Sequence, residues 1–390
     1  MDLALLEQVL AARGEPAYRA RQVWEWAARG VAGYEAMTNV PAPLRAALAE
    51  EVPFTTLAVE TEARSKDGTV KTLFRTHDGH AVEAVLMRYR DGRRSLCLSS
   101  QSGCPLTCTF CATGQMKFGR NLTASEMLDQ ALHFRRETRA EGGKTVPASG
   151  SRGVAGEGGK RATRGTVQAS TARVARALPP EVQRRQAGPE AGGAGREGSP
   201  AGGPTHAVFM GMGEPFLNYD EVIAAARRLP DVGITHRRTT ISTVGWLPGL
   251  TRFVDEVEEP IRLALSVHAA DPKLRSQLMP VNDRYPLADV LAECRRYFAL
   301  RHRKVYVEYV MLAGVNDSAE QARQLAGLLD PKCFKVNLIP YNPTGQYEGS
   351  SRDAIAAFKH VLDRARLPAT VRLTRGRDIA AACGQLAAAP

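Results

Sequence analysis

Hydrophobic and polar positions alternate with two different periods in the first ninety residues. Residues 1–53 have helical spacing, with apolar groups at Leu3, Leu6 and Leu10 and at Tyr18, Val23, Trp24 and Ala27. Residues 57–87 instead form short alternating runs, with the turn dipeptide Asp78-Gly79 between two of them. The pattern predicts a helical domain over residues 1–55 and a β-hairpin extension over residues 56–92.

From residue 93 to residue 387, short apolar strands alternate with amphipathic helical segments. The predicted strands are Ser95–Leu98, Ala207–Met210, Thr239–Ser242, Arg262–Val267, Val305–Val310 and Lys335–Ile339. The predicted helices are Ala124–Arg135, Tyr219–Arg228, Leu287–Leu300, Ser318–Leu329 and Asp353–Arg366. Since such alternation gives right-handed crossovers and a parallel sheet, we expect an α/β fold with a partial (β/α)6 barrel and active residues at the carboxyl ends of its strands.

Residues 140–204 interrupt this alternation. The segment is rich in Gly, Ala, Arg and Ser and contains almost no large apolar or aromatic residue. Such a composition cannot bury enough apolar surface to offset the entropy lost when the chain orders. We predict a disordered insertion within the barrel domain, and the alternative is a basic arm that contacts RNA.

Charge and hydropathy narrow the class of protein. Lys and Arg number 52 against 41 Asp and Glu, and the net charge of +11 favours a polyanionic partner such as nucleic acid. No apolar run approaches the ~20 residues that cross a bilayer. Asp2 and Glu7 interrupt the first apolar stretch, which is unlike a secretory signal. We therefore expect a cytosolic protein without a membrane partner.

Three of the seven cysteines, Cys104, Cys108 and Cys111, crowd together after the first predicted barrel strand. In a reducing compartment, this CxxxCxxC spacing indicates metal ligation or catalysis rather than disulfides. Three thiolates on one loop can hold three irons of a 4Fe–4S cluster and leave the fourth iron open. The alternative is a structural zinc knuckle, which needs a fourth ligand, and the nearest candidate is His133.

Glycines and polar residues follow the other predicted strands. Gly211-Met212-Gly213-Glu214-Pro215 comes after the second strand, and its glycines permit a close approach between the backbone and a ligand. The remaining candidates for ligand contacts are Ser242, Ser266, Val267, His268 and Asn342. Taken alone, a Ser or Asn at such a position more often caps a helix or forms a turn, and a lone His is more often structural.

The cysteine spacing and the Gly-Met-Gly-Glu-Pro run resemble motifs of the radical S-adenosylmethionine superfamily. Together, the segments 95–104, 119–123, 211–215 and 374–386 closely resemble the bacterial radical-type methyltransferases of adenine C2 in ribosomal RNA, over residues 1–387. The resemblance implies that the three cysteines hold the cluster and that its open iron binds S-adenosylmethionine. It also implies that the strand-end residues Gly213, Glu214, Ser242, Ser266, Val267, His268 and Asn342 contact this cofactor.

The resemblance also implies a chemical route, which adenine C2 requires because this electron-poor carbon is not a nucleophile. Two S-adenosylmethionine molecules are used per turnover: the first methylates Cys383, and the second yields a radical that abstracts hydrogen from this methyl group. The methylene radical then adds to the base. Cys97 removes the C2 proton and forms a transient disulfide with Cys383, and Glu83 matches a glutamate assigned to proton handling.

The same resemblance implies partners for the chain, and two alternative functions remain open beside it. The implied substrates are 23S ribosomal RNA, at the peptidyl-transferase centre, and transfer RNA, with an electron donor such as flavodoxin and a monomeric chain. The helices of residues 1–55 resemble an RNA-docking accessory domain, whose candidate phosphate contacts are Arg19, Arg21 and Arg29. The rival functions are methylation of adenine C8 and a zinc-stabilised RNA-binding module without catalysis. Cys294 and Cys333 match no motif, and we expect them to be structural.

Overall fold

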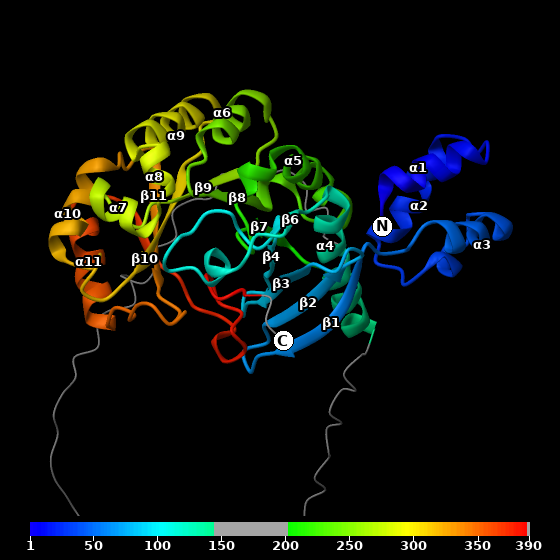
Figure 1. Ribbon diagram of the computed structural model, residues 1–390, viewed down its shortest axis with the longest axis horizontal. Helices are drawn as coiled ribbons and strands as arrows, with labels where there is room; N and C mark the ends of the chain where they lie inside the picture. The colour runs from blue at the N-terminus through cyan, green and yellow to red at the C-terminus, as the bar shows by residue number, and fades with distance from the viewer. Residues whose placement is uncertain (144–201, 388–390) are drawn as a thin grey trace, which may run out of the picture. The chain divides into compact units, whose positions relative to one another are not determined.

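Antiparallel strands lead into the sheet of the computed structural model, which describes residues 1–143 and 202–387 (Figure 1). These strands are β1 (Leu57–Arg64), β2 (Val70–Thr76) and β3 (Ala81–Arg88), and β3 pairs antiparallel with β4 (Arg94–Leu98). Gly79 turns the chain between β2 and β3 with φ +84°, a conformation that favours glycine. The predicted hairpin is therefore confirmed, and it extends the barrel sheet directly.

From β4 onward, all neighbouring strands of this sheet are parallel. They are β7 (His206–Phe209), β8 (Thr239–Thr243), β9 (Arg262–Ser266), β10 (Val305–Met311), β11 (Phe334–Pro340) and β12 (Ala369–Val371). Within the described residues, β1 and β12 are the two edges of the sheet and do not pair with each other. The arrangement confirms the predicted α/β fold with a partial barrel. A separate short ribbon is formed by β5 (Gln101–Ser102) and β6 (Arg120–Asn121).

The longer helices that follow the parallel strands lie on the outer face of the sheet (Figure 1). They are α4 (Ala124–Gly143), α5 (Tyr219–Arg228), α6 (Leu247–Glu256), α9 (Leu287–Arg301), α10 (Ala319–Leu328) and α11 (Arg352–Arg364). The short helices α7 (Pro272–Leu278) and α8 (Val281–Arg284) lie at the carboxyl ends of β8 and β9, where Arg275 donates to the Val244 and Ser266 carbonyls. Short 3₁₀ helices are Tyr34–Ala36, Ala112–Gln115, Pro215–Asn218, Leu229–Val232, His236–Arg238 and Arg377–Ile379. Helix α6 was not predicted, because its first turn contains Pro248 and Gly249. The buried positions Leu250, Phe253 and Val254 have helical spacing and could have revealed it.

The first helices are α1 (Leu3–Ala12), α2 (Tyr18–Ala28) and α3 (Ala42–Glu51). Their predicted apolar faces are buried at Leu6, Leu10, Val23, Trp24 and Ala27. The prediction was wrong for Tyr18, which is 58% exposed because it begins α2 on the outer side of the helix. The Trp24 indole donates to Asp231 (2.7 Å), so α2 contacts the 3₁₀ helix Leu229–Val232 that follows α5.

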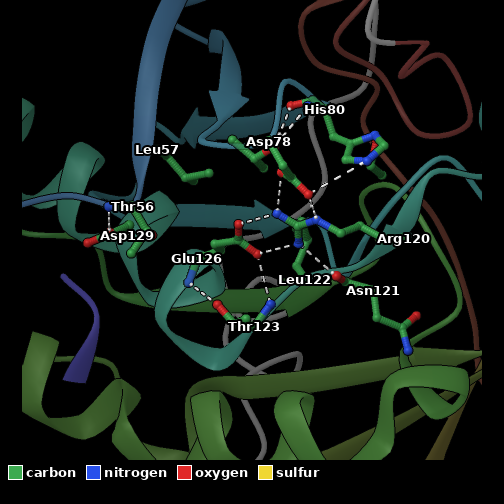
Figure 2. Close-up of polar contacts among 12 residues, drawn as sticks. Thr56, Leu57, Asp78, His80, Arg120, Asn121, Leu122, Thr123, Glu126 and Asp129 are labelled. Atoms are coloured by element: carbon green, nitrogen blue, oxygen red, sulfur yellow. Dashed lines mark hydrogen bonds and ion pairs between the residues drawn. The ribbon is translucent and has the colours of Figure 1, made fainter. Parts of the chain in front are cut away.

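Arg120 connects the hairpin turn to the beginning of α4 (Figure 2). Its guanidinium donates to Asp78 (2.6 and 2.8 Å) and to Glu126 (2.8 and 2.6 Å). The Glu126 carboxylate also accepts the Thr123 backbone N–H (2.9 Å). The segment 119–123, which carried part of the family resemblance, thus fixes the hairpin extension against α4.

The predicted insertion falls mainly outside the described residues, which stop at residue 143 and resume at residue 202. Of its predicted span, residues 140–143 continue α4. A Cβ atom placed on Gly202 would lie 3.5 Å from the Thr138 carbonyl oxygen, so the chain re-enters the fold beside α4. Among the helices of the described ranges, none combines the length and the apolar character that a membrane crossing needs.

Candidate active site

One cavity at the carboxyl ends of the parallel strands gathers most of the predicted site residues. Its lining includes the cysteines Cys97, Cys104, Cys108, Cys111 and Cys383 and the strand-end residues Gly213, Glu214, Ser242, Ser266, His268 and Asn342. Two predicted residues, Glu83 and Val267, are buried elsewhere and do not line it. Cys294 and Cys333 are also buried away from it, as expected for structural thiols.

The loop that contains Cys104, Cys108 and Cys111, called the cysteine loop below, is held by a backbone hydrogen bond and by close packing. The Thr109 N–H donates to the Leu278 carbonyl (3.0 Å), and a side chain on Gly114 would meet the Cys108 carbonyl oxygen at 2.9 Å. Burial raises the pKa of Cys104 to about 12. It also raises the pKa of Cys108 well above its usual value, and proximity to the other two cysteines adds to that shift. A cation is needed to favour three thiolates on one buried loop, and iron bound by sulfur supplies that charge. The donor set therefore fits an iron–sulfur cluster.

The spread of the cysteine sulfurs distinguishes a cluster from a single ion. In residues 1–143 and 202–387, the one set of three potential ligand atoms within 4.8 Å of one another is Glu62, His133 and Glu137. A single zinc ion with 2.3 Å bonds to sulfur would hold thiolates about 3.8 Å apart. His133, the candidate fourth zinc ligand, instead lies 3.4 Å from the Glu62 carboxylate and does not line the cavity. The geometry therefore disfavours the zinc knuckle.

Gly213 and Glu214 organise the turn after β7. Gly213 has φ +97°, and a Cβ atom there would meet the Gln101 side chain at 2.5 Å. The Glu214 carboxylate accepts the backbone N–H groups of Phe216 (3.0 Å) and Val244 (2.9 Å) and so joins the ends of β7 and β8. Burial raises the pKa of Glu214 to about 7. Both residues thus have structural roles besides the predicted cofactor contact.

His268 is held as a neutral imidazole. Its Nδ1 accepts the Val310 N–H (3.0 Å), which leaves the proton on Nε2. Burial and the charge of Arg275 lower the pKa of His268 to about 3. The residue has φ +59°, and its ring lies 4.6 Å from that of Phe110, beside the cysteine loop. His268 can therefore offer a hydrogen-bond donor to a ligand in the cavity at neutral pH.

Two further cysteines line this cavity although they lie far apart in sequence. Cys97 lies near the end of β4, and Cys383 lies in the C-terminal segment, residues 372–387. Cys97 is half-buried, whereas Cys383 is exposed on the cavity wall. Desolvation within the cavity raises the pKa of Cys97 to about 12 and that of Cys383 to about 11, although the positive charge of Arg372 opposes both shifts. Arg372 forms an ion pair with Glu308 (3.3 Å), and Asn337 donates to the same carboxylate (2.9 Å). The sequence did not lead us to predict this ion pair. Glu308 could have indicated it, because it is a glutamate within the otherwise apolar run of β10.

The C-terminal segment is attached to the cysteine loop (Figure 1, red beside cyan). The Ala112 N–H donates to the Gly384 carbonyl (2.8 Å), and the Thr113 hydroxyl donates to the Leu386 carbonyl (2.6 Å). The Asn342 amide, predicted to contact the cofactor, donates to the Cys383 carbonyl (3.1 Å). These contacts bring Cys383 to the predicted cluster ligands.

Glu83 lies on β3, with its carboxylate buried beneath the C-terminal segment. It forms an ion pair with Lys71 (2.7 Å) and accepts the Ala387 N–H (2.9 Å). The residue predicted to handle a proton near the base is therefore, in this conformation, an anchor for the chain that carries Cys383.

Two family models match the chain. Residues 1–53 match the N-terminal domain of the ribosomal RNA large subunit methyltransferases, and residues 195–326 match the radical SAM superfamily. The second match contains Gly213, Glu214, Ser242, Ser266 and His268 of the cavity.

Relatives that match the full length of the chain belong to the same family that these family models indicate. The dual-specificity RNA methyltransferase RlmN of Anaeromyxobacter sp. (strain Fw109-5) is 40% identical over 394 residues, covering 100% of this chain and 89% of the relative. The probable enzyme of the same name from Salinispora tropica is also 40% identical, covering 100% and 92%. A crystal structure of a radical SAM methyltransferase from Sphaerobacter thermophilus is similar with a TM-score of 0.79 and 39% identity, covering 100% of this chain and 98% of that one.

Proposed function

The chain belongs to the RlmN family of radical S-adenosylmethionine RNA methyltransferases, and from this premise we propose that it methylates C2 of adenine in 23S ribosomal RNA and in transfer RNA. The observation that carries the proposal is the shared cavity of the three cluster cysteines, Cys97 and Cys383. Methyl transfer through a protein thiol requires this proximity, because one sulfur must meet first the cofactor and then the base.

When bound, the 4Fe–4S cluster and two S-adenosylmethionine molecules per turnover would supply a methyl group and a radical that abstracts hydrogen. Cys104, Cys108 and Cys111 would hold the cluster, and His268 and the turn at Gly213 would orient the cofactor. The Cys383 sulfur receives the methyl group and carries it to adenine C2. The positive charge of Arg372 lowers the pKa of both Cys383 and Cys97, which favours their reactive thiolate forms.

Release of the product follows at the same two cysteines. The adduct of the methylene radical with the base carries one unpaired electron, which it gives up to the one-electron carrier of the enzyme. Cys97 then removes the C2 proton. The Cys97 sulfur next releases this proton and bonds to the Cys383 sulfur as the bond from that sulfur to the product carbon breaks. The electron pair of the broken bond stays with the product methyl carbon, which takes up a proton. The disulfide is afterwards reduced by an external thiol or dithiol. For Glu83 we propose a role as proton acceptor, which requires that the C-terminal segment release this carboxylate.

Anaerobic purification with iron and sulfide analysis, followed by assays on 23S RNA fragments and transfer RNA with labelled cofactor, tests the proposal. We expect about four irons per chain and methyl transfer that disappears in Cys383→Ala. Cys333→Ala, which alters a buried cysteine outside the cavity, is the control and should retain activity. Zinc in place of iron, or methylation that survives the loss of Cys383, would contradict the proposal.

Mass spectrometry of the digested RNA decides between C2 and C8, since the two methyladenosines separate chromatographically. We also propose that a one-electron donor such as flavodoxin reduces the enzyme and that the chain acts as a monomer. Replacing the donor with dithionite in the assay and measuring the sedimentation coefficient test these two points.

A further inference from the structure

The mouth of the cavity has a composition that the proposed roles of the cysteines do not explain. Its lining includes Tyr89, after β3, and Leu373 and Arg375, after β12. Leu373 is 75% exposed, and this is the largest exposed fraction of any large hydrophobic side chain in residues 1–143 and 202–387. Because Leu373 both lines the cavity and is open to solvent, it stands at the entrance.

Tyr89 provides a planar surface beside this entrance. The guanidinium carbon of Arg93 lies 4.6 Å from the centre of the Tyr89 ring, and that of Arg375 lies 5.2 Å from it. The Arg93 side chain is half exposed, so its planar group is accessible to a ligand. Aromatic rings and guanidinium planes are the groups on which proteins stack unpaired bases.

The position of these residues suits the substrate. An adenine stacked in folded RNA cannot reach Cys97 and Cys383 within a cavity unless it leaves the stack. Proteins that unstack a nucleic acid commonly insert an exposed apolar side chain between neighbouring bases. A solitary exposed leucine needs no explanation on an ordinary surface, but this one is placed where the base must pass.

We propose that Leu373 is a wedge that occupies the gap left by the extruded adenine, and that the Arg93–Tyr89–Arg375 stack supports a neighbouring nucleotide. The ligand is an RNA strand, bound through the faces of its bases rather than through their sequence-specific edges. Leu373 is therefore a positioning residue of the methylation reaction, and this inference rests on the proposed function.

The test replaces Leu373 with Gln, which has a similar length but is polar, and with Met, which retains the apolar character. The target adenine of a 23S RNA fragment and of a transfer RNA is replaced by the fluorescent analogue 2-aminopurine, which brightens when unstacked. We expect Leu373→Gln to reduce this fluorescence gain and to lower kcat/KM for methylation of the natural RNAs about tenfold, with Leu373→Met close to wild type. Tyr89→Ala should lower kcat/KM similarly.

Leu300→Gln is the matched control, because Leu300 is 52% exposed on α9 and does not line the cavity. It should leave fluorescence and methylation unchanged, and iron content checks that every variant is folded. If the wild type does not methylate RNA, the proposed function fails. If the wild type is active and Leu373→Gln equals it in fluorescence gain and kcat/KM on both RNAs, the wedge is wrong and the proposed function stands. An effect on one RNA alone would limit the wedge to that substrate.

Discussion

At the scale of single residues, burial sets the charge of the groups that surround the cavity. His268 is neutral because it is buried, because Arg275 adds positive charge nearby, and because its Nδ1 accepts a backbone N–H. Desolvation within the cavity raises the pKa of the half-buried Cys97 and of the more exposed Cys383, and Arg372 lowers the pKa of both. The cavity thus combines a neutral histidine with an arginine, Arg372, whose charge acts on Cys97 and Cys383.

His268 gives a prediction for the pH dependence of stability. Its pKa is about 3 in the folded chain against 6.5 in the unfolded chain, so below pH 6.5 the unfolded state binds the additional proton. The free energy of unfolding should therefore fall as pH decreases from 6.5 towards 3. Between pH 7.5 and pH 5 the contribution lost is about 2 kcal/mol.

Urea denaturation of the wild type and of His268→Gln at these two pH values measures this contribution. The variant should lose about 2 kcal/mol less than the wild type on acidification. Equal losses in the two proteins would show that His268 is protonated in the folded chain.

At the scale of elements, short turns at the carboxyl ends of the strands position the side chains that line the cavity. The turn after β7 is built from Gly213, whose backbone is in the left-handed region, and Glu214, whose carboxylate reaches the end of β8. The sequence motif predicted that these residues contact the cofactor, and both line the cavity. Their mutual packing with Gln101 became visible only in three dimensions.

Gly213→Ala should distort this turn, because the new methyl group adds both backbone strain and a clash with Gln101. We expect a loss of about 2–4 kcal/mol in stability, together with at least a tenfold fall in methylation. Gly79→Ala is the matched control, since Gly79 also has positive φ but has no neighbour within 4 Å of an added Cβ atom. It should cost about 1 kcal/mol and leave methylation intact. Equal stability losses in the two variants would rule out the clash.

At the scale of the whole molecule, the described residues 1–143 and 202–387 contain the sheet and the cavity lining given above. The chain leaves after α4 and returns beside Thr138, which precedes Gly143 by about 7.5 Å along the helix axis. A linker of six residues spans up to about 20 Å. It can therefore close the fold without residues 144–201.

Replacing residues 144–201 with a six-residue Gly/Ser linker should leave the melting temperature unchanged and methylation within about twofold of the wild type. Thermal unfolding and kcat/KM on both RNA substrates measure the outcome. A selective rise in KM for RNA, with kcat retained, would instead support the alternative of a basic arm that contacts RNA.

Sequence alone determined the features that depend on short stretches of chain. The alternation of apolar strands and amphipathic helices gave the parallel sheet, because side-chain periodicity reports secondary structure directly. The spacing of Cys104, Cys108 and Cys111 predicted a cluster site, since all three cysteines lie close together in sequence on one loop. Motif resemblance added the pairing of Cys97 with Cys383, which no local pattern contains.

Tertiary structure decided which distant residues meet. Packing of the C-terminal segment on the cysteine loop brings Cys383 into the cavity, draws Glu83 onto the Ala387 N–H, and sets Arg372 against Glu308. It also left Leu373 exposed at the entrance. These contacts join residues far apart in sequence, and they depend on how whole elements pack, which periodicity and spacing along the chain do not encode.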